Sequence, residues 1–363
     1  MRRIVFRIME PMMFRSASEL STTTRGPQTV ALSRPLPSPS TIAGALATLI
    51  LQAENRTPPT GDPMGWYEEV IDILGGKDSI ILKGPYLMTN KDTIPYLMTN
   101  EYTIYVQYNN GLLPLGELKN LTSGKLFDAT KKLNNIAKRF DLGYVDLIGI
   151  RLSDMKKAIG KDERGLLYSM RMVDYGRIGV QMKINCNIMV EVLKISNSLE
   201  RALQEHKIIR LGGEGRLVEV STNECQSVSE SVANSRSDSM RLYVATPILF
   251  EASSSLISKE AESGMFFLGS NINKKMQSCL DEVGIKATSI KIAGRLGILG
   301  GFSVARAFRK TVYAALQPGS IIEVSDLQLS KEEYSTIYSK GLGLFRDLGY
   351  GTVIPISITN KLN

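Results

Sequence analysis

The sequence contains few of the residues on which catalysis and metal binding most often depend. There is one histidine, His206, among 363 residues, and there are three cysteines, Cys186, Cys225 and Cys279. The cysteines lie far apart and form no CxxC pair, so neither a disulfide framework nor a zinc site is indicated. Histidine is the usual group for acid–base chemistry near neutral pH. His206 is expected at the C-terminal end of a helix, where a capping role is favoured over catalysis.

Long hydrophobic runs are also missing. The longest, residues 41–53, is shorter than the ~20 residues that a membrane-spanning helix needs. The N-terminus, MRRIVFRIMEP, lacks the apolar core and small-residue cleavage site of a signal peptide. We therefore expect a cytoplasmic protein without membrane contact, in a reducing compartment that suits unpaired cysteines.

Motifs for nucleotide cofactors and metals are absent as well. No GxxxxGK string followed by Ser or Thr occurs, and the glycine-rich segments follow predicted helices instead of preceding them, unlike a dinucleotide fingerprint. The acidic pairs Glu68-Glu69 and Glu332-Glu333 are adjacent in sequence, which favours solvated or capping roles over metal ligation. We expect no cofactor, no metal site and no catalytic residue.

Charge is where the sequence departs from the average. Lysine and arginine exceed the acidic residues by eight, the sequence pI is about 9.2, and residues 274–310 alone hold eight basic and two acidic residues. Such a basic segment favours a polyanionic partner. Aromatic residues make up only 7% of the chain, which favours contact with a nucleic-acid backbone over base stacking.

The order of predicted elements gives the same α+β plan twice. The predicted domains are 1–220 and 240–363, and a serine-rich linker at 221–239 separates them. In the second domain a strand (241–250) precedes a helix over INKKMQSCLDEVG, two strand-like runs, a short helix ending at Gly341 and a last strand, TVIPISI. This βαββαβ order is that of a ferredoxin-like, or RRM-like, unit.

The first domain is predicted to repeat this plan. A strand at 3–9 precedes a helix that begins after Ser38, with Pro39 at its first position, and runs to about Ala53. Towards its end the helix NSLERALQEHK precedes a glycine-rich loop and a strand.

Large insertions, at about 85–178, are expected within the first domain. The string PYLMTN occurs twice, at 85–90 and 95–100, and predicts an extended hairpin. Residues 123–140 predict a helix with Phe127, Leu133, Ala137 and Phe140 on its buried side. The order of the middle strands is left open.

Each predicted domain has a glycine-rich loop between its second helix and its last strand. In RLGGEGRL, residues 210–217, backbone N–H groups can turn outward to a phosphate and Arg216 offers a forked donor. The second loop, 341–351, holds four glycines and Arg346. A tight turn beside a surface arginine also explains either string by itself. Recurrence at the equivalent place in both domains favours RNA binding.

The segment GGFSVARAFRK, residues 300–310, adds a basic and aromatic cluster. Arg306, Arg309 and Lys310 lie close to Phe302 and Phe308, a mixture suited to phosphate contact and base stacking. A solvated charged face above core aromatic residues remains the alternative.

The duplicated unit and its glycine loops resemble the RAMP superfamily of CRISPR-associated proteins. The strings PSPSTIAGAL (37–46), RLGGEGRLVEV (210–220) and AALQPGSIIEV (314–324), followed by the glycine-rich C-terminus, resemble the third-subunit family of the type III-B Cmr effector complex. The resemblance implies a non-catalytic subunit that holds the 5′ tag of the crRNA and contacts the large polymerase-like subunit and the backbone RAMP subunit. Its middle, 109–178, has no motif that we can align.

The residues expected to contact RNA are taken from this resemblance and from the basic and glycine-rich segments. They are Arg15, Arg34, Ser40, Thr41, Gly212, Gly213, Gly215, Arg216, Arg306, Arg309, Lys310, Gly341, Gly343, Arg346, Gly349 and Gly351. Two alternatives stay open: a metal-independent endoribonuclease of the same superfamily that processes precursor crRNA, and a purely structural subunit whose glycines only make turns.

Overall fold

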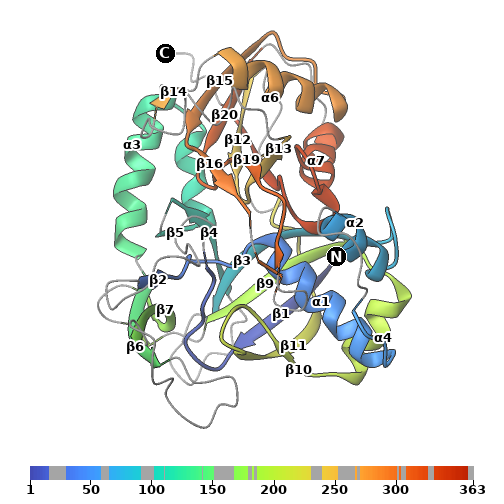
Figure 1. Cartoon of the computed structure of the whole chain (residues 1–363). Helices are drawn as coiled ribbons and strands as arrows, with labels where there is room; N and C mark the ends of the chain where they lie inside the picture. Colours follow the sequence, from blue (N-terminus) through green and yellow to red (C-terminus); the bar gives the residue numbers. More distant parts are fainter. Residues whose placement is uncertain are drawn as a thin grey trace, which may run out of the picture.

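The computed structural model describes most of the chain. The described residues are 1–15, 30–58, 65–90, 102–109, 111–140, 142–150, 167–178, 182–183, 186–229, 239–251, 266–267, 270–300, 302–303, 308–325 and 331–358. They form a mixed α/β structure with two halves, one up to residue 229 and one from residue 239 (Figure 1).

A seven-stranded sheet forms the first half, in the order β10-β11-β1-β9-β3-β4-β5. Its strands are β1 (Arg2–Ile8), β3 (Ile81–Asn90), β4 (Tyr102–Tyr108), β5 (Gly111–Pro114), β9 (Cys186–Lys194), β10 (Ile208–Arg210) and β11 (Leu217–Glu224). Every neighbouring pair is antiparallel. In β1, an inner strand of this sheet, Ile4 and Phe6 join one buried cluster and Val5 joins another. Both faces of this sheet are therefore covered.

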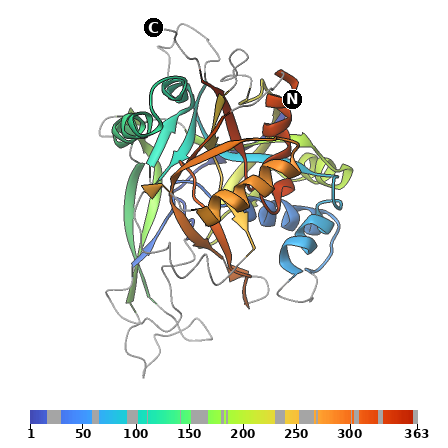
Figure 2. The same cartoon turned by 90° about the horizontal axis from the view of Figure 1, so that it is seen from above.

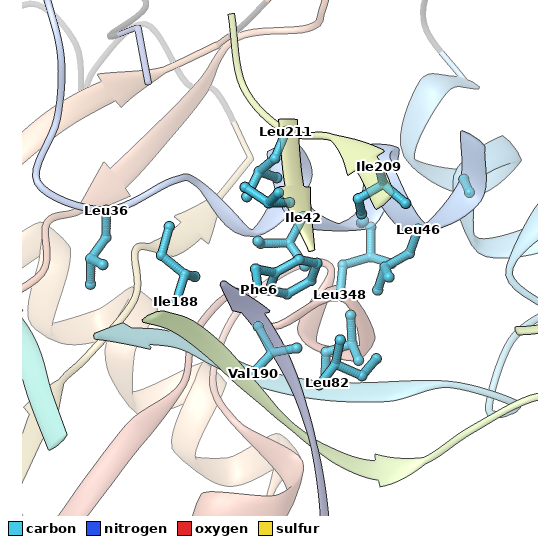
Figure 3. Close-up of a cluster of buried hydrophobic side chains, with 14 of the residues drawn as sticks. Phe6, Leu36, Ile42, Leu46, Leu82, Ile188, Val190, Ile209, Leu211 and Leu348 are labelled. Carbon is cyan, nitrogen blue, oxygen red and sulfur yellow. The ribbon is translucent and has the colours of Figure 1, made fainter. Parts of the chain in front are cut away.

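Helices α1 (Pro39–Ala53) and α4 (Asn197–Glu205) cover one face of this sheet, and α2 (Trp66–Ile73) lies beside α1. Figure 3 shows Phe6 of β1 among Ile42 and Leu46 of α1 and Val190 of β9. The predicted start of α1 is confirmed, because the Ser38 hydroxyl accepts the backbone N–H of Thr41 at 3.3 Å.

The sheet of the second half has the order β14-β15-β20-β12-β21. The elements of this half are β12 (Ser239–Val244), β14 (Phe266–Phe267), α6 (Ser270–Glu282), β15 (Ser289–Gly294), β20 (Ile321–Ser325), α7 (Lys331–Lys340), η4 (Arg346–Leu348) and β21 (Val353–Ser357). The face predicted for α6 is confirmed, since Ile272, Met276, Leu280 and Val283 are all buried in one cluster. That cluster lies between the sheet and the two helices.

Three predicted strands of this half are each broken in two by a corner. The shorter pieces β13 (Ile248–Phe250), β16 (Leu296–Leu299) and β19 (Tyr313–Leu316) form a second sheet in the order β13-β19-β16. The breaks fall at Pro247, at Gly294 and at Gly319, whose φ is +86°. Proline lacks the N–H that a strand needs, and glycine allows the bend. A small pair, β17 (Phe302–Ser303) and β18 (Phe308–Arg309), completes this half.

The two halves pack together through the remaining faces of their sheets. Val5, Tyr86 and Met189 from the first sheet share one buried cluster with Tyr243 and Ile354 from the second. Polar groups cross the same boundary: the Tyr86 and Tyr338 hydroxyls lie 3.0 Å apart, and Tyr338 donates to the buried carboxylate of Glu191. Both sheets are thus covered by helices on one side and by each other on the other side.

The insertion of the first half forms two structures. One is the helical segment η2 (Leu115–Leu121), α3 (Leu126–Ala137) and η3 (Lys138–Phe140), which lies on the side opposite α1 and α4 (Figures 1 and 2). The other is a sheet of β2 (Val30–Leu32), β7 (Leu167–Ile178) and β6 (Leu142–Ile150), with β8 (Met182–Lys183) paired to β7.

The buried side predicted for α3 is partly wrong. Leu126, Ala129, Leu133 and Ala137 form the buried stripe, whereas Phe127 is 61% exposed. The reason is the helical period, because Phe127 lies about 100° around the helix axis from Leu126. The first PYLMTN copy belongs to β3, and the second lies outside the described residues.

The start of the predicted linker is ordered structure. β11 continues to Glu224, and the buried Val228 donates its N–H to Glu191 at 2.6 Å. No helix in the described part of the chain combines the length and the apolar character needed to cross a membrane.

Candidate nucleic-acid interface

The first glycine loop packs against the segment that follows β1. Gly212 has φ +77°, and a Cβ at this position would lie 2.6 Å from the Met13 carbonyl oxygen. Gly213 donates its N–H to the same oxygen at 2.8 Å, and Leu211 donates to the carbonyl of Arg216 at 2.9 Å. Gly212 therefore allows the loop to pack closely against Met13, and the N–H of Gly213 is already used.

Arg216 is held by an internal carboxylate. It forms an ion pair with Glu10, whose other oxygen accepts the N–H of Leu217 at 3.1 Å. That backbone hydrogen bond, together with Arg216, lowers the pKa of Glu10. The sequence predicts Arg216 as a fork for phosphate, but in the structure this fork clamps the loop to Glu10.

The tip of the loop is the part that faces outward. Glu214 and Gly215 have φ +62° and +66°, and a Cβ at Gly215 would meet nothing within 4 Å. Their N–H groups have no hydrogen-bond partner among the described residues. Glu214 pairs with Arg15. Two backbone donors and one arginine thus lie at an exposed tip beside a carboxylate.

The segment under the loop connects it to a pocket. Phe14 donates its N–H to the Ser33 hydroxyl at 2.9 Å, and Arg34 donates its N–H to the Phe14 carbonyl at 2.8 Å. Ser33 and Arg34 belong to the wall of a pocket of about 410 Å³. Its described lining residues are Leu32, Ser33, Arg34, Pro35, Gln107, Asn109, Tyr144, Arg171, Arg295, Leu296, Gln317 and Pro318.

This pocket, which we call the arginine pocket, lies where the two halves meet. A Cβ at Gly319, in the turn before β20, would lie 3.0 Å from the backbone nitrogen of Asn109, in the turn after β4. The described lining includes three guanidinium and three amide side chains and no carboxylate. Hydrogen-bond donors of this kind, in a described lining without a carboxylate, suit an anion that also carries polar edges.

The three arginines of the pocket differ in their partners. Arg171 forms a bidentate pair with Asp146, with distances of 2.8 and 3.2 Å. Arg295 has no carboxylate partner among the residues that the structure describes. Among the described residues, no ion pair of Arg295 would have to break before this side chain binds a phosphate.

The predicted residues Ser40 and Thr41 serve the start of helix α1. The Ser38 hydroxyl lies 2.9 Å from the hydroxyls of both, and Ser40 is buried. Burial raises the pKa of Tyr350, and the nearby Ser40 and Ser38 hydroxyls offset part of this increase. These contacts place both hydroxyls at the helix start, and their contact with RNA stays a prediction.

The second glycine loop is a packing element. Gly341, Gly349 and Gly351 are buried, and their N–H groups donate to the carbonyls of Ile337, Arg346 and Pro247. A Cβ at Gly343 would lie 2.6 Å from the Leu249 carbonyl oxygen, and one at Gly349 would lie 2.7 Å from that of Gly84. Arg346 lies 3.7 Å from Glu282. No N–H of the three buried glycines is left to donate to RNA. Contact of this loop with RNA stays a prediction.

The basic and aromatic segment is only partly described. Arg306 lies outside the described residues, and so does the side chain of Arg309 in β18. The Lys310 ammonium lies 3.2 Å from the centre of the Trp66 ring, and burial lowers the pKa of Lys310 to about 7. The Lys310 side chain therefore forms a cation–π contact with Trp66 inside the protein.

The structure therefore brings Arg15 and Arg34 close to the loop that holds Gly212, Gly213, Gly215 and Arg216. Ser40, Thr41 and Lys310 make their contacts elsewhere in the fold. Arg171, Arg295, Gln107, Asn109 and Gln317 were missed by sequence reasoning, although Arg295 lies in the basic segment 274–310. These residues come from distant positions, and no spacing in the sequence connects them.

Groups for catalysis are sparse in the described structure. His206 is at the C-cap position of α4, as predicted. Among the described residues, no three His, Cys, Asp or Glu side chains are grouped so that they could hold a metal ion.

Comparison with known proteins gives one family and a common fold. Residues 146–358 match the family model described as CRISPR-associated protein (Cas_Cmr3). The CRISPR system CMR subunit Cmr3 of Saccharolobus solfataricus is 25% identical over 360 residues, which cover 98% of this chain and 96% of that protein.

Solved structures agree with this match at the level of the fold. A chain of the type III-B Cmr-beta complex bound to cognate target RNA and AMPPnP has a TM-score of 0.55 and 20% identity, over 97% of this chain and 95% of that one. A chain of the same complex bound to cognate target RNA gives a TM-score of 0.54 and 20% identity, over 97% and 96% of the two chains.

Proposed function

Because this chain belongs to the Cas_Cmr3 family of CRISPR-associated proteins, we propose that it is an RNA-binding subunit of a type III-B Cmr ribonucleoprotein. In this role it holds the 5′ tag of the crRNA, docks the large polymerase-like subunit and contacts the backbone RAMP subunit, in antiviral defence. The match of almost the whole chain to a Cmr subunit supports this proposal.

We also propose that both halves are ferredoxin-like units. The strand orders β11-β1-β9-β3 and β21-β12-β20-β15 support it. Numbered along each unit, both orders are 4-1-3-2, with helices after the first and third strands. The ferredoxin-like fold of each half is proposed mainly from its strand topology, because the family match does not specify it.

The observation that carries the RNA-binding proposal is the arginine pocket and its continuation to the first glycine loop. Arg15, Arg34, Arg171 and Arg295 lie along connected segments, and the outward N–H groups of Glu214 and Gly215 lie at one end. Phosphates are bound by such guanidinium and backbone donors. An RRM-like unit usually stacks bases on its open sheet face, but here both sheet faces are covered. RNA is therefore proposed to lie on this surface.

Replacing Arg295 with alanine is expected to weaken binding of a crRNA 5′-tag oligonucleotide about tenfold, as the loss of a charged hydrogen bond costs about 1.5 kcal/mol. The slope of log affinity against log salt should fall by about one, because one phosphate contact is lost. Fluorescence anisotropy over a salt series measures both quantities. Arg56→Ala is the control, since Arg56 is an exposed arginine at the far end of α1. Equal affinities and slopes for R295A and R56A would reject the arginine pocket as the RNA site.

Replacing Glu214 with glutamine is expected to strengthen RNA binding three- to fivefold at low salt. The carboxylate holds Arg15 and repels phosphate, and an exposed pair of this kind is worth about 0.2–1 kcal/mol. Glu54→Gln is the matched control, because the Arg56–Glu54 side chains are 54% and 32% exposed and those of Arg15–Glu214 are 44% and 27% exposed. The gain should disappear in the R15A background and at high salt. A gain of equal size in E54Q would show a general charge effect instead.

The main alternative is a metal-independent endoribonuclease. Incubating the purified protein with repeat RNA in EDTA tests it, because specific cleavage would overturn the non-catalytic proposal. The partner proposal is tested separately by identifying the RNA and proteins that copurify with the tagged chain from native cells.

A further inference from the structure

The arginine pocket combines two kinds of binding group at one place. Arg34, Arg171 and Arg295 supply charge, whereas Gln107, Asn109 and Gln317 supply amide groups, each of which both donates and accepts hydrogen bonds. Guanidinium groups alone suffice to hold a phosphate chain. Amides beside them add the donors and acceptors that read the edge of a base.

The amide side of the pocket is shaped by contacts between the halves. Asn109 has φ +54° in the turn after β4, and the Gln107 side-chain amide donates to the Asn109 carbonyl at 3.1 Å. Gln317 comes from the turn before β20, and a Cβ at Gly297 would lie 2.6 Å from its Nε2 atom. Because Gly297 has no side chain, the Gln317 amide fits over β16. Three amides from two halves thus converge on one volume.

The size and position of the pocket limit what it can hold. A volume of about 410 Å³ lies within the roughly 300–1,000 Å³ of small-ligand sites. It is enough for one nucleotide and too small for a stacked run of bases. Tyr144, which is 41% exposed, is the aromatic side chain of the described wall. A base that enters must leave its stack, and an aromatic ring can replace part of the lost stacking.

We infer that the arginine pocket takes one unstacked nucleotide, with its phosphate on Arg295 and Arg34 and its base edge at the amides of Gln107, Asn109 and Gln317. This inference rests on the proposed RNA-binding function and adds a base-reading site to it. The nucleotide is a unit of the bound RNA or a free nucleoside monophosphate, which offers the same phosphate and base.

The first test uses the full-length protein and tag oligonucleotides in which each position is changed in turn to all four bases. Wild-type protein should show one position where a change of base alters affinity about five- to tenfold, since a good pair of base-edge hydrogen bonds discriminates at this level. Gln317→Ala should flatten the preference at that position and leave the salt slope unchanged, because no charge is removed. Arg295→Ala should lower the slope and weaken all sequences alike.

Gln204→Ala is the matched control, because Gln204 is a glutamine of α4 that lines a separate pocket. Chemical denaturation of Q317A checks that its fold is intact. The inference is overturned if R295A weakens binding while wild type and Q317A discriminate bases equally, and the RNA-binding function then stands. If R295A, Q317A and wild type all bind tag RNA no better than an unrelated RNA, the proposed function itself fails.

The second test separates the two sources of the nucleotide. AMP, GMP, CMP and UMP are titrated at millimolar concentration into wild type, Q317A and R295A, and ligand-observed NMR reports binding. Binding by wild type that both variants lose assigns a free nucleotide to the pocket. Base discrimination in RNA without binding of any free nucleotide assigns the pocket to a unit of the strand. Both results are compatible with the inference on one condition, namely that the base discrimination depends on Gln317.

Discussion

Gly351→Ala is expected to remove more than about 4 kcal/mol of folding free energy, which is exceptional for one substitution and a large share of the roughly 5–15 kcal/mol of a typical protein. A Cβ at Gly351 would lie 1.6 Å from the Leu342 carbonyl oxygen and 2.7 Å from its carbon, and the residue has φ +60°. Both backbone groups of Gly351 are engaged: its N–H donates to Pro247, and its carbonyl accepts from Leu342, each at 2.9 Å. The loop has no way to make room without losing these bonds.

The same substitution should also affect the proposed RNA site. Leu348 (Figure 3) and Tyr350, from the second half, are buried in the core cluster of the first half. When the loop shifts, the two halves lose this anchor, and the arginine pocket between them loses its shape. We therefore expect G351A to express poorly or to bind tag RNA at least as weakly as R295A.

Gly215→Ala is the matched control for this prediction. Gly215 has φ +66°, close to that of Gly351, but a Cβ there meets nothing within 4 Å. Only the left-handed conformation is then penalised, by about 1–2 kcal/mol. Urea unfolding followed by circular dichroism measures both variants. Equal losses for G215A and G351A would mean that backbone conformation, and not the overlap with Leu342, decides the stability of the second glycine loop.

Arg241→Ala is expected to cost about 3–5 kcal/mol, the range for removing one partner of a buried ion pair. The Arg241 side chain is 2% exposed and lies in β12. It donates to the carbonyls of Leu121 at 2.8 Å, Ser123 at 3.2 Å and Gly124 at 2.6 Å, and it pairs with Glu323 at 2.7 Å. Removing it leaves three carbonyls and a carboxylate without their donor. This arginine attaches the helical insertion of the first half to the sheet of the second.

Lys291→Ala gives the comparison on the same carboxylate. The Lys291 ammonium lies 3.9 Å from Glu323, but its side chain is 63% exposed, so its loss should cost less than about 0.5 kcal/mol. Arg241→Lys should recover only part of the stability, because an ammonium cannot reach three carbonyls and a carboxylate in the geometry of the fork. A loss of under 1 kcal/mol for R241A in urea unfolding would mean that Arg241 does not hold the helical insertion on the second sheet.

Local patterns in the sequence predicted the elements well. The N-cap at Ser38, the apolar stripe of α6 and the end of α7 before Gly341 follow from spacings within one helix. The misses have non-local causes. The corners at Gly294 and Gly319 depend on a second sheet, which is formed by the ends of the same strands. The exposure of Phe127 is the exception, because it follows from the helical period.

The candidate site, even more than the fold, depends on contacts that local sequence patterns do not predict. Composition establishes that the chain is basic and has one histidine, and local spacing predicts a repeated order of elements with two glycine-rich loops after corresponding helices. What those glycines and arginines do depends on contacts between residues that are distant in the sequence. A glycine N–H is available to a ligand only if no carbonyl lies opposite, and Met13, Ile337 and Pro247 lie opposite three of them.

The availability of an arginine likewise depends on its neighbours in space. Arg216 is taken by Glu10, 206 positions away in the sequence, whereas Arg295 has no carboxylate partner among the described residues. Hydrogen bonds and ion pairs act over a few ångströms, and it is chain packing that brings partners from distant positions within that range. Composition and periodicity therefore identify the elements and the charge, and packing decides which donors of the described residues are available to a ligand.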